Sequence, residues 1–106
     1  MAAPIASRRI AFRRIAGAAL DHADTITRRW LPAGRREGAE WVSLNPTRND
    51  RRAGSFKVNL ETGAWSDFAT GDSGGDLISL AAYLFRIRQT EAALRVADML
   101  GISRYE

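Results

Sequence analysis

Four cationic side chains fall within ten residues in the middle of the chain. Arg48, Arg51 and Arg52 belong to a polar segment, residues 47–54, and Lys57 follows on a stretch that alternates apolar and polar residues. Trp65 comes shortly afterwards. Cations that track phosphates, beside a flat side chain that stacks on bases, are typical of proteins that bind single-stranded nucleic acid. We therefore predict a binding surface at these five residues. The alternative is a solvated loop with Trp65 in the core.

The glycine-rich segment 71–76 (GDSGGD) is a second candidate site, because it precedes a predicted helix. Glycines at a helix N-terminus can hold phosphate. Here Asp72 and Asp76 would repel it, and the Gly-Lys-Ser/Thr sequence of a P-loop is missing. We expect a capping loop with Asp76 as the N-cap. His22 is expected to be an ordinary helix-face histidine, and no catalytic constellation emerges, so we do not predict an enzyme by itself.

Composition excludes several classes of site. The 106 residues include one histidine and no cysteine, which rules out disulfides, thiolate zinc sites and cysteine nucleophiles. The length suits one small domain. No apolar run approaches the ~20 residues that cross a bilayer, so we expect a soluble, cytoplasmic protein. We expect no cofactor and no metal.

Positive charge is concentrated in the first part of the chain. Residues 1–60 carry twelve Lys and Arg against five Asp and Glu, a net charge of +7, whereas the remainder has a net charge of −3. A basic half favours a polyanionic partner such as nucleic acid, although an arginine-rich composition also arises from a GC-rich genome. Residues 1–14 hold four arginines and no acid. They are expected to form a basic arm that either orders on nucleic acid or only aids solubility; in a eukaryote they would suggest a transit peptide.

Periodicity predicts the elements that position these residues. Apolar residues at 15, 19, 23, 26 and 30 predict one helix over Ile10–Trp30, ended by Pro32 and Gly34. Residues 35–38 are predicted to be a charged connector. Alternation predicts strands over 40–44, 55–60 and 64–68, with a hairpin at 61–63. Helices are expected over 77–86 and from Thr90, as N-cap, to Gly101. The predicted fold is α+β: an N-terminal helix, a small three-stranded antiparallel sheet and two C-terminal helices.

Four short motifs between Trp41 and Ile102 carry a family resemblance. They are Asn45-Pro46-Thr47-Arg48, Gly54-Ser55-Phe56, the run 65–71 (WSDFATG) and Gly75-Asp76-Leu77-Ile78. In order and spacing they resemble the Cys-Pro-x-His, Pro-Ser-Phe, aromatic-x-Cys-x-x-Cys-Gly and Gly-Asp-x-Ile motifs in the N-terminal zinc-ribbon domain of bacterial and phage DNA primases. The resemblance implies a single domain over 15–106, with a ribbon core over 39–76 and helices over 76–101.

The positions that would hold zinc in that family are all non-ligating here: Asn45, Arg48, Asp67 and Thr70. The chain thus resembles a ribbon that has lost its metal. A structural zinc can contribute about 10–16 kcal/mol of apparent folding free energy, so other interactions must replace it. We predict an ion pair between Arg48 and Asp67, with Asn45 and Thr70 hydrogen-bonding around it. Apolar packing is expected from Trp41, Phe56, Val58 and Phe68.

The resemblance implies engagement of single-stranded template DNA, in replication or in plasmid or phage maintenance. Arg48, Arg51, Arg52 and Lys57 would contact phosphates, and Trp65 would stack on a base. The chain would act as a non-catalytic part of a primase or primase-helicase, or beside a catalytic subunit. The alternative is a protein-interaction adaptor that has lost DNA binding. Its contacts would come from the C-terminal helices, with exposed apolar groups at Tyr83, Phe85 and Met99.

Overall fold

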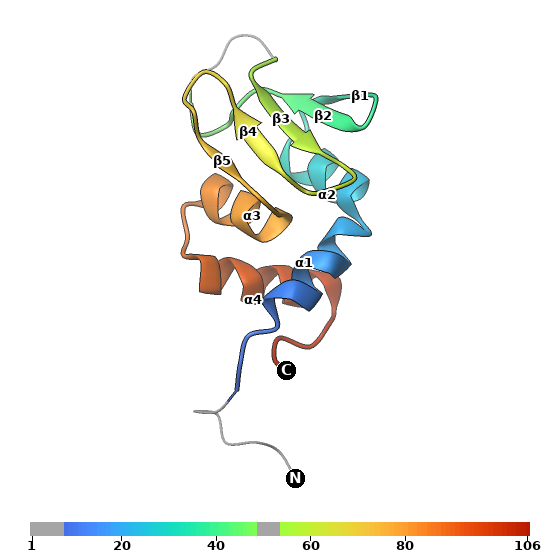
Figure 1. Ribbon diagram of the computed structural model, residues 1–106, viewed down its shortest axis with the longest axis vertical. Helices are drawn as coiled ribbons and strands as arrows, with labels where there is room; N and C mark the ends of the chain where they lie inside the picture. Colours follow the sequence, from blue (N-terminus) through green and yellow to red (C-terminus); the bar gives the residue numbers. More distant parts are fainter. Residues whose placement is uncertain (1–7, 49–53) are drawn as a thin grey trace.

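A computed structural model describes residues 8–48 and 54–106 (Figure 1). In these ranges the chain forms four helices and a five-stranded antiparallel sheet. The α+β class is confirmed, whereas the predicted three helices and three strands are too few. The elements in chain order are α1 (Phe12–Leu20), α2 (Ala23–Trp30), β1 (Arg35–Glu37), β2 (Glu40–Ser43), β3 (Phe56–Asn59), β4 (Trp65–Asp67), β5 (Ser73–Gly74), α3 (Leu77–Phe85) and α4 (Gln89–Leu100).

The predicted single N-terminal helix is wrong, because it breaks at Asp21 and His22 into α1 and α2. The two halves bury their apolar faces against different partners. α1 packs on α3 and α4, whereas the end of α2 meets β2, where the Trp41 indole Nε1 donates a hydrogen bond to the Leu31 carbonyl. One straight helix could not serve both surfaces.

Residues at the start of the described chain do not form a separate arm. Arg13 and Arg14 lie in α1, and Arg14 donates hydrogen bonds to the carbonyls of Ser103 and Tyr105. Ile10 pairs with Tyr105 in an isolated antiparallel bridge. The segment from residue 8 to 14 is therefore attached to the C-terminal end of the chain.

Two further strands lie in segments predicted to be irregular. Residues 35–37, predicted to be a connector, form β1 and pair with β2. Ser73 and Gly74, within the predicted capping loop, form β5 and pair with β4. Both are short edge strands with exposed or polar residues, so neither carries the apolar alternation that marks a strand in a sequence.

The helix boundaries in the C-terminal part follow ordinary capping rules. Asp76 caps α3 as predicted, since its side chain accepts from the Ser79 backbone N–H in a reciprocal capping box. Gly101 ends α4 with a φ of 70°, also as predicted. The predicted N-cap at Thr90 is wrong: α4 begins at Gln89 after Arg88, whose extended backbone starts the helix without a side-chain cap.

The sheet has an inner face, packed on the helices, and an outer face. Figure 1 shows α3 between the sheet and α4. Phe56 and Val58 of β3 are fully buried on the inner face, and their register partners on β4 are Asp67 and Trp65. Lys57 pairs with Ser66, and the alternation of side chains places both on the outer face. None of the helices in the described ranges has both the length and the apolar character needed to span a bilayer.

Candidate nucleic-acid interface

Two matching turns follow β2 and β4. In the first, the Asn45 side-chain oxygen Oδ1 accepts from the Thr47 backbone N–H at 2.9 Å, and the Arg48 N–H reaches the Asn45 carbonyl at 3.1 Å. In the second, Asp67 Oδ1 accepts from the Ala69 N–H at 2.8 Å, and the Thr70 N–H reaches the Asp67 carbonyl at 3.3 Å. Both are turns in which an Asn or Asp side chain bonds the backbone two residues on. They occupy the positions of the two Cys-containing motifs in the resembling family.

The two turns are joined directly through their first residues. Asn45 Nδ2 donates to Asp67 Oδ2 at 2.7 Å, and each of the two residues is only 1 % exposed. Arg48 Nε lies 3.4 Å from the same carboxylate oxygen, so the predicted ion pair is formed. Thr70 does not join it: its hydroxyl oxygen accepts from the Asp72 N–H inside its own loop. The hydrogen bond predicted for Asn45 is therefore present, and that for Thr70 goes elsewhere.

Tyr83 of α3 extends this cluster to the helices. Its hydroxyl accepts from Asn45 Nδ2 at 2.9 Å and donates to Asp72 Oδ2 at 2.8 Å. We call Asn45, Arg48, Asp67, Asp72 and Tyr83 the strand-end cluster. The prediction that Tyr83 is an exposed apolar group is wrong. Its ring is partly buried against those of Phe56 and Trp65, and its hydroxyl hydrogen-bonds within the cluster.

The buried carboxylate of Asp67 remains ionised. Burial by itself raises its pKa, but hydrogen bonds from Asn45 and from the Ala69 N–H, with the nearby Arg48 charge, outweigh burial and hold the pKa below its ordinary value of 3.8. Removing one partner of a buried, hydrogen-bonded charge is costly, since the charge then loses its compensation. The cluster thus fixes the ends of β2 and β4 against each other.

The donor set of the cluster does not fit a zinc ion. Asn45 points its amide nitrogen, a hydrogen-bond donor, into the contact, and Arg48 supplies a positive charge. Asp67 is the one anionic ligand among the four motif positions, and its oxygens already accept from Asn45 and Ala69. No group of three or more His, Asp or Glu side chains in residues 8–48 and 54–106 could hold a metal ion.

The structure separates the predicted binding residues. Arg51 and Arg52 lie outside the described residues. Lys57 is half-buried on the outer face of the sheet. Arg48 is 33 % exposed at its side chain and is held by the strand-end cluster.

Trp65, predicted to stack on a base, lies instead in the core with 5 % of its surface exposed. Its ring contacts those of Phe56 and Tyr83, with centroids 5.9 and 4.6 Å away, and its Nε1 donates to the Ser79 hydroxyl at 2.9 Å. The register with Val58 turns this side chain inward. A ring covered in this way is not accessible to a base.

Phe68, predicted to pack in the core, is instead an exposed aromatic residue. It follows β4 directly, and 75 % of its surface is exposed. Its backbone N–H bonds to the Ser55 carbonyl, but the β3–β4 pairing ends at Asp67 and Phe68 is the first residue after it in the turn. The ring is therefore presented to solvent at the end of β4. The turn residues that follow Asp67 are the signal that could have revealed this, because a turn removes Phe68 from the apolar alternation of the strand.

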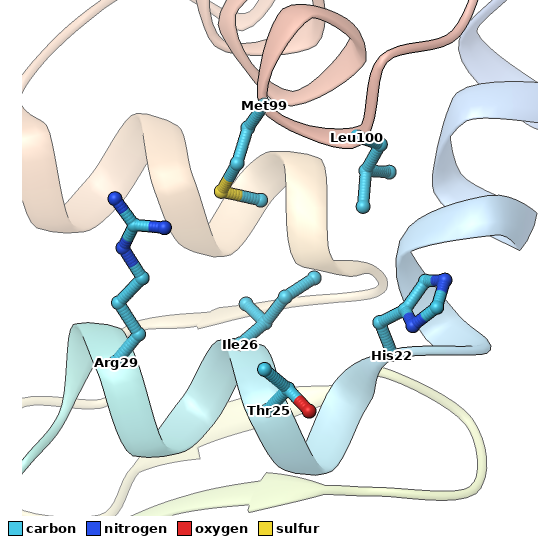
Figure 2. Close-up of a pocket in the computed structure, with 6 residues that line it drawn as sticks. All are labelled: His22, Thr25, Ile26, Arg29, Met99 and Leu100. Carbon is cyan, nitrogen blue, oxygen red and sulfur yellow. The ribbon is translucent and has the colours of Figure 1, made fainter.

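Two hollows lie away from the outer face. One, of about 290 Å³, separates α2 from α4, and Figure 2 shows Ile26, Met99 and Leu100 in its wall, with His22 and Arg29 at its margins. His22 is exposed, with its side chain at the start of α2. The other, of about 220 Å³, lies beside the turn that follows β2 and includes Arg48 in its lining.

Comparisons with known proteins identify the fold. No protein-family profile matches the chain, and no curated protein sequence matches it significantly. Among solved structures, the chain is similar to the crystal structure of the Aquifex aeolicus primase, zinc binding and RNA polymerase domains. The TM-score is 0.72 over 90 % of this chain, with 23 % sequence identity, and the match spans 22 % of the length of the Aquifex chain. The chain therefore has a primase-related fold.

Proposed function

We propose that this protein binds single-stranded DNA through the outer face of its sheet and thereby engages a template strand, in replication or in plasmid or phage maintenance. The primase-related fold supports a role in that process. We propose further that the chain itself is not catalytic and acts with a primase or primase-helicase catalytic unit in the cytoplasm.

The observation that carries the proposal is the exposure of Phe68. An aromatic ring that is 75 % exposed, two residues after the outward polar residue Ser66, is available for stacking on a base. Lys57, the register partner of Ser66 on the outer face, offers a cation to the backbone phosphates. Stacking of this kind tolerates any base sequence, because every base has a flat face.

The phosphate contacts are assigned to four cations. Arg48 lies in the turn after β2 and Lys57 in β3, and Arg51 and Arg52 belong to the segment between them in the sequence. Phe68 replaces Trp65 as the stacking residue. The positive charge of residues 1–60 adds a sequence-independent attraction to the strand.

Fluorescence anisotropy of a labelled single-stranded oligonucleotide tests the proposal. Phe68→Ala should weaken binding by about 1–3 kcal/mol, the loss expected for one stacked base. Phe12→Ala is the matched control, because Phe12 is also an exposed phenylalanine, 38 % exposed at the start of α1. Lys57→Ala should weaken binding to all sequences and reduce the salt slope by about one. Equal affinities of Phe68→Ala and the native protein would refute the stacking role.

The adaptor function remains a second candidate, favoured by the hollow between α2 and α4. Ile26, Met99 and Leu100 offer an apolar surface there, and Met99 is 37 % exposed. This function predicts no binding to any oligonucleotide and a stable complex with a protein encoded beside this one. Met99→Glu would disrupt that complex.

A further inference from the structure

A small pocket opens where the end of α2 meets the turn after β2. It encloses about 220 Å³ and is lined mainly by Trp30, Pro32, Ala33, Leu44, Pro46 and Arg48. Sites for drug-sized ligands take about 300–1,000 Å³, so this one suits a single ring rather than a larger molecule. Its walls come from two segments of the chain, residues 30–33 and 43–48.

The walls are flat and rigid. Trp30 is held by Phe85 of α3, which meets its ring edge-on with centroids 5.6 Å apart. Pro32 and Pro46 have fixed rings and are both exposed at the surface. The indole of Trp30 and the two proline rings are apolar and rigid, so they lose little conformational entropy when a flat ligand ring packs against them.

Two arginines lie at or near this pocket. Arg48 lines it, and its side chain is 33 % exposed. Arg86, the exposed residue that ends α3, reaches the Thr47 carbonyl at 3.5 Å and so lies against the same turn. A ligand with a flat apolar body and a neighbouring negative charge matches this arrangement. A nucleotide of a single strand has both parts.

We infer that this pocket receives one nucleobase of the bound single strand, with the adjoining phosphate at Arg48 and Arg86. The inference rests on the proposed function and extends it from the outer face of the sheet to the α2 side. Arg48 connects the two places, because it lines the pocket and pairs with Asp67, the residue directly before Phe68. A strand that stacks on Phe68 can therefore pass over the strand-end cluster and place a second base beside Trp30.

Tryptophan fluorescence provides the direct test, because the three tryptophans differ in access. Trp41 and Trp65 are buried, with 3 % and 5 % exposed, whereas Trp30 is partly exposed in the pocket wall. Saturation with an oligothymidylate should quench Trp30. An abasic oligomer of equal length keeps the phosphates and lacks the bases, so it should bind without quenching.

A pocket-filling variant tests the same site without removing core packing. Ala33→Leu should lower oligothymidylate affinity at least about fivefold, the lower end of the range for one stacked base, and should abolish the quench. Ala18→Leu makes the same change at a partly exposed alanine of α1, the helix that packs on α3 and α4, and serves as the control. Both variants should show native circular dichroism.

The outcomes separate this inference from the proposed function. Two results together would overturn the pocket inference: Ala33→Leu binds oligothymidylate with the native affinity, and the tryptophan fluorescence of the native protein is not quenched at saturation. If Phe68→Ala still weakens binding, the DNA-binding proposal stands. If the native protein binds no oligonucleotide, both fail. Quenching of Trp30 by N-acetyl-leucine amide but not by oligothymidylate would assign the pocket to a partner side chain and also overturn the inference.

Discussion

The two faces of the sheet are built from the same strands and differ in what they contribute. On the inner face, Phe56, Val58 and Trp65 are 0–5 % exposed and pack on the helices. On the outer face, Lys57 and Ser66 are partly exposed, and Phe68, in the turn at the end of β4, is largely exposed. Val42 of β2 lies opposite Lys57 and is only 2 % exposed, so this division holds for β3 and β4. In these two strands, stability depends on one set of alternating residues and the proposed binding on the other.

Strand β4 and the residue after it depart from the usual link between polarity and burial. Asp67 is charged and faces inward, and Phe68 is apolar and faces outward. The register with Phe56 fixes the inward direction of Asp67, and the turn that begins there exposes Phe68. Places where a local rule is broken are expected at functional or strained sites, and here the inward charge is neutralised by Arg48 and Asn45.

The largest effect is expected on the inner face. Phe56→Ala removes a fully buried ring that stacks with Trp65 and Tyr83, so the free energy of unfolding should fall by about 3–5 kcal/mol. Urea unfolding followed by circular dichroism measures this loss. A loss below about 1 kcal/mol would contradict the assignment of this face to the core.

Restoring the ligands of the resembling motifs should convert the strand-end cluster into a metal site. A variant with Asn45→Cys, Arg48→His, Asp67→Cys and Thr70→Cys offers three thiolates and an imidazole, a common tetrahedral zinc set. Zinc at 100 times its Kd should stabilise this variant by about 2.7 kcal/mol.

Thermal unfolding with and without zinc measures the effect, and cobalt absorption reports tetrahedral geometry. The variant with Asn45→Ser, Arg48→His, Asp67→Ser and Thr70→Ser, which offers no thiolate, is the control. If zinc does not raise the Tm of the four-residue variant, the first and fourth residues of the two turns are not close enough together to bind one ion.

Removal of the buried Asp67 charge should lower the free energy of unfolding by a smaller amount, and that amount should depend on pH. Asp67→Asn removes the acceptor of the Asn45 amide and the partner of Arg48, so the protein should lose about 1–3 kcal/mol of stability at pH 7. Because the folded pKa of Asp67 lies below 3.8, its ionised form stabilises the native protein above that pH.

The stabilisation disappears as the pH falls through 3.8 and then through the lower folded pKa. The difference between the native protein and Asp67→Asn, measured by urea unfolding from pH 7 to pH 2.5, should therefore shrink at the acid end. A difference that is constant with pH would show that the charge of Asp67 does not contribute.

The smallest effect on stability is expected on the outer face. Phe68→Ala should change the free energy of unfolding by less than about 0.5 kcal/mol, because the ring is 75 % exposed. The same urea measurement applies. A loss above 2 kcal/mol would mean that Phe68 packs against the protein and is not free to stack.

Much of the fold could be predicted from periodicity and capping residues. The alternation at residues 55–60, the cap at Asp76 and the glycine at 101 each correspond to an observed element. The break between α1 and α2 could not be predicted in this way, because the apolar spacing runs on through it and tertiary packing decides the bend. The edge strands β1 and β5 were missed because they are short and lack apolar alternation.

The candidate site was predicted in part. The opposite charges at 48 and 67 were enough to predict the ion pair, because the resemblance aligned the two turns. The roles of Trp65 and Phe68 were exchanged, since both are aromatic and the hydrophobic pattern alone favours burying each. Register against β3 turns Trp65 inward, and register is a property of the pair of strands rather than of either sequence. Phe68 is exposed because it lies in the turn after β4.

The most direct test of the central claim is a titration of the native protein into labelled single-stranded and double-stranded oligonucleotides at two salt concentrations, followed by anisotropy. We predict tighter binding to the single strand, weakened as salt rises because phosphate contacts release counterions. No binding at low salt, or equal binding to the duplex, would contradict the assignment of the outer face to a single strand.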